Sequence, residues 1–145
     1  MRRIFRPKFG PDDVEGIFER YFEDVRLIEV LTNVAVPAYD IEENRRLWFR
    51  SISSAHGDVL MRDLVRGATA APTFFPPARF SVNKRVSAKG HVALVHGALF
   101  ANNPSQSALL LRNQGDRSLL FVSLGTGQSA RKNSFEAAWG WGMLG

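Results

Sequence analysis

With 145 residues, 45% of them hydrophobic, the chain is long enough for one globular domain and too apolar for a disordered one. It has no cysteine, which excludes a disulfide framework and a thiolate metal site. The formal net charge of +5 favours anionic partners such as a lipid surface, and a merely solvated basic surface is the alternative.

The basic residues gather in two places, near the start of the chain and in a later loop. They are Arg2, Arg3, Arg6 and Lys8, and then Lys84, Arg85 and Lys89. No apolar run approaches the roughly 18 residues of a membrane span. The basic start is not followed by the apolar core of a secretory signal. These features predict a cytoplasmic or peripheral membrane protein.

The first part of the chain is predicted to form helices and then an antiparallel hairpin. Residues 11–23 repeat apolar side chains every three or four positions, as an amphipathic helix does, and a short second helix covers residues 26–31. Strands at 32–39 and 46–52 flank a turn at 40–44, and Pro37 indicates an edge strand or a bulge. Asp40 is either an active carboxylate or, as is commoner, an acceptor for turn amides.

A helix over residues 59–69 is predicted next, capped by Asp58 and able to pack closely through Gly67. Prolines then interrupt the chain around Phe74 and Phe75. These rings either plug the core or line a lipid-facing cleft, and the core is the usual place for aromatic side chains. Strands at 79–83 and 91–95 follow, joined by the polar, basic loop 84–90.

Residues 94–106 combine a buried strand end, a tight turn and the start of a helix. Asn103 suits the N-cap of that helix, Pro104 its first position, and Gln106 the partner in a capping box. His96 therefore stands at the end of a strand, where ligands of open α/β sheets bind. The alternative is that His96 is a hydrogen-bonded structural residue, which is common at such positions.

The last part of the chain is less informative. Residues 118–124 form a continuous apolar run that is typical of a strand buried on both faces, and it enters the turn Gly125-Thr126-Gly127. Residues 136–145 have no assignable structure. The order of elements predicts an α/β fold with a mixed β-sheet flanked by helices. His56, His91 and His96 lack metal-ligand spacing, so neither a metal nor a cofactor is expected.

Four blocks taken together resemble the patatin-like phospholipase family: AYD…WFRS, RGATAAPTFFPP, HGALFANNP and FVSLGTG. The resemblance implies a three-layer fold in which residues 1–127 are the C-terminal part of the domain and residues 128–145 a tail. It also implies a serine lipid acyl hydrolase that works through a Ser–Asp dyad on lipid or acyl-ester substrates, with a covalent acyl-enzyme.

His96 takes the position of the family's catalytic Asp, which stands in an Asp-Gly-Gly or Asp-Gly-Ala turn. The turn and cap around it would be Gly97, Ala98, Asn102, Asn103 and Pro104. The sequence contains neither GxSxG nor the glycine-rich oxyanion loop. An elbow motif is also missing around each serine that could serve as a substitute nucleophile: Ser51, Ser53, Ser54, Ser105, Ser107 and Ser123.

The expectation is therefore a portion of a lipid acyl hydrolase that is inactive alone. The alternatives are a non-catalytic module that binds a membrane or a protein surface, and a decayed gene product. Binding to nucleic acid is not expected, because the sequence contains no recognised module or aromatic–basic stacking platform.

Overall fold

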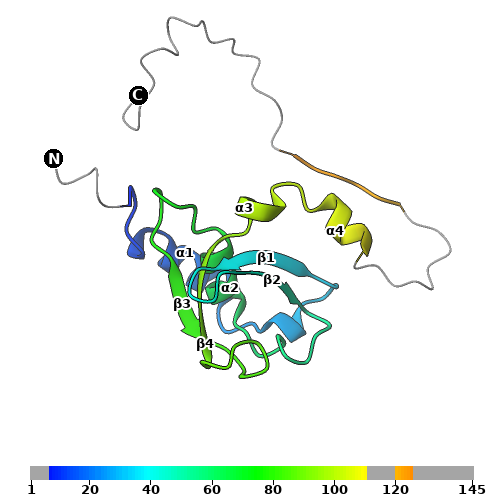
Figure 1. The fold of residues 1–145 in the computed structure, drawn as a ribbon, viewed down its shortest axis with the longest axis horizontal. Coiled ribbons are helices and arrows are strands. Elements are labelled where there is room, and N and C mark those ends of the chain that lie inside the picture. The colour runs from blue at the N-terminus through cyan, green and yellow to red at the C-terminus, as the bar shows by residue number, and fades with distance from the viewer. Residues whose placement is uncertain (1–6, 111–119, 126–145) are drawn as a thin grey trace, which may run out of the picture. The chain divides into compact units, whose positions relative to one another are not determined.

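The computed structural model describes residues 7–110 and 120–125 (Figure 1). The chain divides into two units, residues 1–112 and 113–145, so the described part of the second unit is residues 120–125. The elements are α1 (Asp12–Phe22), the 3-10 helix η2 (Leu27–Glu29), β1 (Ala35–Asp40), β2 (Arg45–Arg50), α2 (Met61–Ala68), β3 (Ala78–Ser81), β4 (His91–His96), α3 (Ala98–Ala101) and α4 (Ser105–Leu110).

The described strands form one sheet in the order β2-β1-β4-β3, and every pairing among them is antiparallel. The hairpins β1–β2 and β3–β4 are local, and they join at the centre where Ala38 lies opposite His96 and Asp40 opposite Leu94. Together with the helices, this sheet confirms the predicted α/β class.

The core of the first unit lies between α2 and the sheet (Figure 1). Leu27, Leu64 and Leu94 are fully buried there. A Cβ atom at Gly67 would stand 2.8 Å from the Cβ of Leu94, so the glycine lets α2 lie directly on β4. This confirms the predicted close packing at Gly67.

Two local predictions were wrong in this part of the chain. Asp58 does not cap α2, because the helix begins at Met61 with Leu60 as N-cap, and the exposed Asp58 carboxylate instead lies 3.8 Å from Arg26. Pro37 marks neither an edge strand nor a bulge, because β1 is an interior strand. The proline is tolerated since β4 pairs with β1 only from Ala38 onward, so Pro37 faces Trp48 of β2 alone.

The prediction of Phe74 as a core plug was also wrong, because this side chain is 47% exposed. Thr73 has φ +72°, and this left-handed residue turns the loop toward the segment before α1 rather than into the core. The carbonyls of Thr73 and Phe74 accept hydrogen bonds from the amides of Lys8 and Phe9.

The buried strand predicted at 118–124 is not found in its described part. Residues 120–125 have no strand assignment, and Leu120, Val122 and Leu124 are 64–90% exposed. An apolar run becomes a doubly buried strand only where other elements cover both of its faces, which the run itself cannot specify.

Several predictions fall outside the described residues. They concern the basic residues at 2–6, the end of the helix near 113–115, Thr126 and Gly127, and the segment 136–145. The two predicted domains, 1–127 and 128–145, remain predictions. No helix in the described part of the chain combines the length and apolar character needed to cross a membrane.

Candidate functional site around His96

The predicted strand–turn–helix is present, and the segment 68–70 at the end of α2 holds its strand end in place. The amide of His96 donates to the carbonyl of Ala70 at 3.1 Å, and the amide of Gly97 donates to the carbonyl of Ala68 at 3.2 Å. The end of β4 is therefore bonded to β1 on one side, and to the last residue of α2 and the segment after it on another.

The His96 ring is oriented by a third contact to the same segment. Its Nδ1 lies 2.7 Å from the carbonyl oxygen of Ala68. A carbonyl only accepts, so Nδ1 must carry the proton, and the neutral ring then has a bare Nε2 that can accept one. Within the described residues Nε2 has no hydrogen-bond partner, and the side chain is half-buried. This is the form of histidine that can act as a general base.

The turn after His96 brings the backbone of Gly97 close to the backbone of β1. A Cβ at Gly97 would stand 2.0 Å from the carbonyl oxygen of Pro37. Gly97 has φ −64°, so its requirement is for space rather than for an unusual backbone angle. Ala98 then begins the short helix α3, which the sequence did not predict.

The predicted cap of the following helix is confirmed for Asn103, whereas Pro104, predicted as the first helical residue, lies just before α4, which begins at Ser105. The Asn103 side-chain oxygen accepts a hydrogen bond from the amide of Ser105 at 3.1 Å, and the amide of Ala108 donates to the carbonyl of Pro104 at 2.9 Å. Asn102 ends α3 in a helical conformation. The side chain of Gln106 lies outside what the structure describes.

His96 does not line either of two cavities found elsewhere in the first unit. A cavity of about 370 Å³ lies between α1, α2 and the segment 76–80, and its lining includes Asp63, Arg66 and Phe80. A second cavity of about 140 Å³ is lined by Ala55, Asp58, Val59 and residues 81–83. The described residues contain no cluster of three potential metal-ligating side chains.

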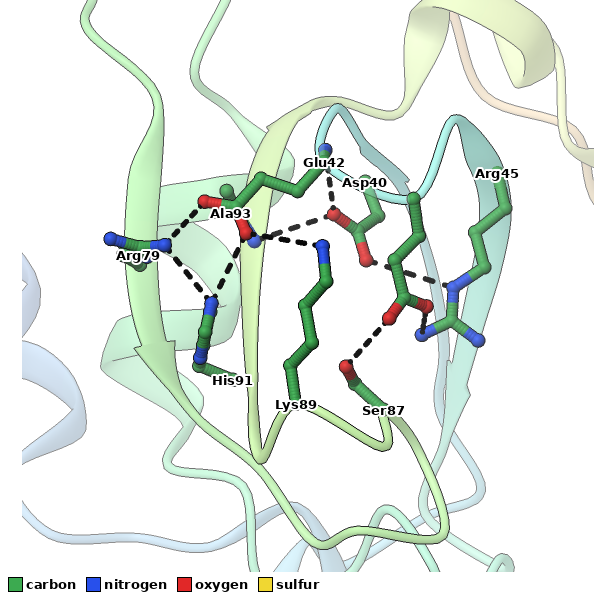
Figure 2. A network of polar contacts seen from close by, with 9 residues as sticks. Asp40, Glu42, Arg45, Arg79, Ser87, Lys89, His91 and Ala93 are labelled. Atoms are coloured by element: carbon green, nitrogen blue, oxygen red, sulfur yellow. Dashed lines mark hydrogen bonds and ion pairs between the residues drawn. The ribbon is translucent and has the colours of Figure 1, made fainter.

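A polar network at the β1–β2 turn was missed by sequence reasoning (Figure 2). Asp40 is fully buried and accepts a hydrogen bond from the amide of Glu42 at 3.1 Å, which confirms its predicted role as a turn acceptor. The other carboxylate oxygen lies 3.6 Å from Nε of Arg45. Arg45 also reaches Glu43 at 2.8 Å and the carbonyl of Val86 at 2.6 Å.

Glu42 is the centre of the exposed half of this network, where Figure 2 shows it facing cationic and polar side chains of the β3–β4 hairpin. Its carboxylate lies 2.5 Å from Arg79, 3.1 Å from His91 and 3.6 Å from Lys89. The hydrogen bond from His91 lowers the pKa of Glu42 most, and the charges of Arg79 and Lys89 lower it further. The network ties the β1–β2 turn to the β3–β4 hairpin.

Curated proteins similar to this chain are patatins. The chain is 30% identical to Patatin-like protein 1 of Arabidopsis thaliana over 158 aligned positions, which cover 95% of this chain and 38% of that protein. It is 29% identical to Patatin group A-2 of Solanum tuberosum, covering 98% of this chain and 42% of that protein. The chain is thus similar to patatins over nearly its whole length.

Another relative is named Probable inactive patatin-3-Kuras 1, also of Solanum tuberosum, and is 26% identical over 97% of this chain. The chain spans 38–43% of the length of these three relatives. No protein-family model matches the sequence.

Proposed function

We propose that this patatin-like chain is part of a lipid acyl hydrolase in which His96 takes the role of the carboxylate base. Its relatives support an ester hydrolase of lipid metabolism. The observation that carries the role of His96 is the bond from Nδ1 to the Ala68 carbonyl, which leaves Nε2 as the acceptor. The nucleophile is not in this sequence.

In the proposed reaction, a serine hydroxyl attacks the acyl carbon of a lipid ester, and its proton passes to Nε2 of His96. The resulting imidazolium returns that proton to the departing alcohol. Water then attacks the acyl-enzyme, and His96 accepts the proton of the water in the same way. An imidazole lacks the permanent negative charge of an Asp, so this site would be weaker than a Ser–Asp dyad.

The chain by itself is expected to be inactive because it supplies no elbow serine. A short-chain p-nitrophenyl ester assay on the purified chain should show no turnover above buffer. Turnover that survives His96→Ala but is blocked by a serine-directed phosphonate would reveal another nucleophile and contradict the proposal.

The role of His96 is best tested in a chimera, with this chain replacing the matching segment of Patatin-like protein 1. His96→Ala should lower the esterase kcat of the chimera by about 10²–10⁴-fold, the usual contribution of a general base. His96→Asp should retain or raise it. Equal rates for the chimera with and without the His96→Ala substitution would show that the residue is structural.

The tautomer can be measured independently of any activity by nitrogen-15 NMR of the histidine rings above pH 7. His96 should carry its proton on Nδ1. His56 is the internal control, because its Nδ1 accepts a hydrogen bond from the amide of Arg50 at 3.1 Å and its proton must therefore sit on Nε2. A proton on Nε2 of His96 would remove the base from the proposed mechanism.

A further inference from the structure

Four residues form a cluster on the surface of the first unit, called here the aromatic–lysine cluster: Lys8, Phe9, Phe74 and Phe75. The amide of Lys8 donates to the carbonyl of Thr73 and that of Phe9 to the carbonyl of Phe74, both at 2.9 Å. The rings of Phe9 and Phe75 stack with centroids 5.2 Å apart. The segment before α1 and the loop after α2 are therefore joined through both backbone and side chains.

The cluster presents its aromatic surface to solvent. Phe9 is 39% exposed and Phe74 is 47% exposed. The ammonium group of Lys8 lies 5.2 Å from the centre of the Phe9 ring and 5.7 Å from that of Phe74, so one cation stands over two exposed rings. Prolines on both sides of Phe74 restrict the loop, which lowers the entropy lost if the rings insert into a partner.

We propose that the aromatic–lysine cluster is a docking surface for an anionic lipid bilayer. Aromatic rings beside a lysine suit the interface, where apolar rings enter the acyl boundary and the ammonium group stays among headgroups. The charge of the sequence is complementary to such a surface, since Arg2, Arg3 and Arg6 precede Lys8 and residues 2–11 contain no carboxylate.

A membrane fits this cluster better than a protein groove does. The exposed rings project from a loop and a neighbouring segment rather than from a regular helical or strand surface, and a lysine ammonium group stands over them. This proposal goes beyond the proposed hydrolase function and does not depend on it, because the cluster contains neither His96 nor any residue of its turn.

The test is co-sedimentation of the full chain with vesicles of phosphatidylcholine, with and without phosphatidylserine. We expect binding to the anionic vesicles that weakens as salt rises. Lys8→Ala should weaken that binding by about fivefold, as expected for one basic residue near an anionic surface. Phe74→Ser should weaken it by about tenfold, by removing one inserting ring.

Matched control variants distinguish binding through this cluster from non-specific adsorption to the vesicles. Leu31→Ser removes a side chain that is fully exposed elsewhere, and Lys84→Ala removes a cation from the loop between β3 and β4. Both should bind like the unmodified chain. Equal losses in the control and cluster variants would overturn the proposal.

A second readout uses the absence of cysteine from the chain. Phe74→Cys and Leu31→Cys can each be labelled with one environment-sensitive fluorophore. On addition of anionic vesicles, the dye at position 74 should shift to the blue and the dye at position 31 should not. Because this signal reports local insertion rather than total binding, an unshifted dye at position 74 would also overturn the proposal.

Discussion

Gly97 is the residue of the His96 turn that tolerates least change. A methyl group there would stand 2.0 Å from the carbonyl oxygen of Pro37, which belongs to the backbone of β1 and cannot rotate away. Gly16, in contrast, has nothing within 4 Å of the place where a Cβ would go, although it lies within α1. A side chain would therefore clash with the backbone at Gly97 but would meet open space at Gly16.

Gly97→Ala is expected to lower the free energy of unfolding by about 3 kcal/mol, since the turn must move away from β1. Gly16→Ala should raise it by about 0.5–1 kcal/mol, because alanine is the better helix former. Urea titrations of the three proteins would measure both changes. A Gly97→Ala protein as stable as the unmodified chain would refute the close approach of the turn to β1.

His56 makes the stability of the chain sensitive to mild acid. Its partial burial, aided by the charge of Arg50, lowers its pKa below the ordinary 6.5. The folded chain therefore binds a proton at His56 more weakly than the unfolded chain does, and protonation favours unfolding. The stabilisation is fully present above about pH 6.5 and is lost as pH falls through the lowered pKa of the folded state.

His56→Asn tests this, because the asparagine oxygen can take the place of Nδ1 as acceptor for the Arg50 amide and does not titrate. Free energies of unfolding measured from about pH 7 to 5 should fall more steeply for the unmodified chain than for the variant. Parallel profiles would show that His56 does not contribute to the acid response.

At the scale of elements, the β1–β2 hairpin depends on Asp40 at its turn. The carboxylate both accepts from the Glu42 amide and lies beside Arg45, while Arg45 keeps a second partner in Glu43. If Asp40 loses only its negative charge, Arg45 is therefore still paired with Glu43. Loss of the oxygen atoms leaves a turn amide without its acceptor.

Asp40→Ala is expected to destabilise the chain by about 3 kcal/mol, and Asp40→Asn by about half of that, because asparagine keeps an oxygen for the turn amide. The difference between the two variants in urea unfolding measures the turn acceptor by itself. Equal destabilisation by both substitutions would assign the whole effect to the pairing with Arg45.

The elements that local patterns specify were predicted well. The helix at 12–22, the β1–β2 hairpin, the strands β3 and β4 and the Asn103 cap all follow from apolar spacing, turn residues and capping chemistry. The errors concern which elements meet. Pro37 lies on an interior strand because β4 stops pairing one residue short of it, and Phe74 turns outward because its loop bonds to the segment at 8–9.

At His96 and in the Glu42 network, too, local features could be predicted from the sequence and contacts between distant elements could not. The position of His96 at a strand end follows from the sequence, but its tautomer depends on the Ala68 carbonyl, 28 residues away. Glu42 meets Arg79 and His91 only because β4 pairs with both β1 and β3. No spacing in the sequence indicates that contact, and the nearest available signal was the concentration of charge in the two turns.

At the scale of the whole molecule, exposed apolar residues at 120–124 predict self-association. Leu120 and Leu124 are about nine-tenths exposed, and an uncovered run of this kind pairs readily with another chain. We expect the purified chain to form oligomers that grow with concentration, and Leu120→Lys with Leu124→Lys to shift it toward monomer in analytical ultracentrifugation. A monomeric unmodified chain that unfolds cooperatively would contradict this expectation.

The order of strands also bears on how the molecule folds. Each hairpin closes a short loop and can form within about 1–10 μs, whereas the central pairing joins Asp40 and Leu94 across about fifty residues of intervening chain. The slow step of folding is therefore expected to be the pairing of the two hairpins with each other. His96 gains its pairing with Ala38 of β1 only when the two hairpins meet, so we expect the candidate base to be among the last features of the fold to become organised.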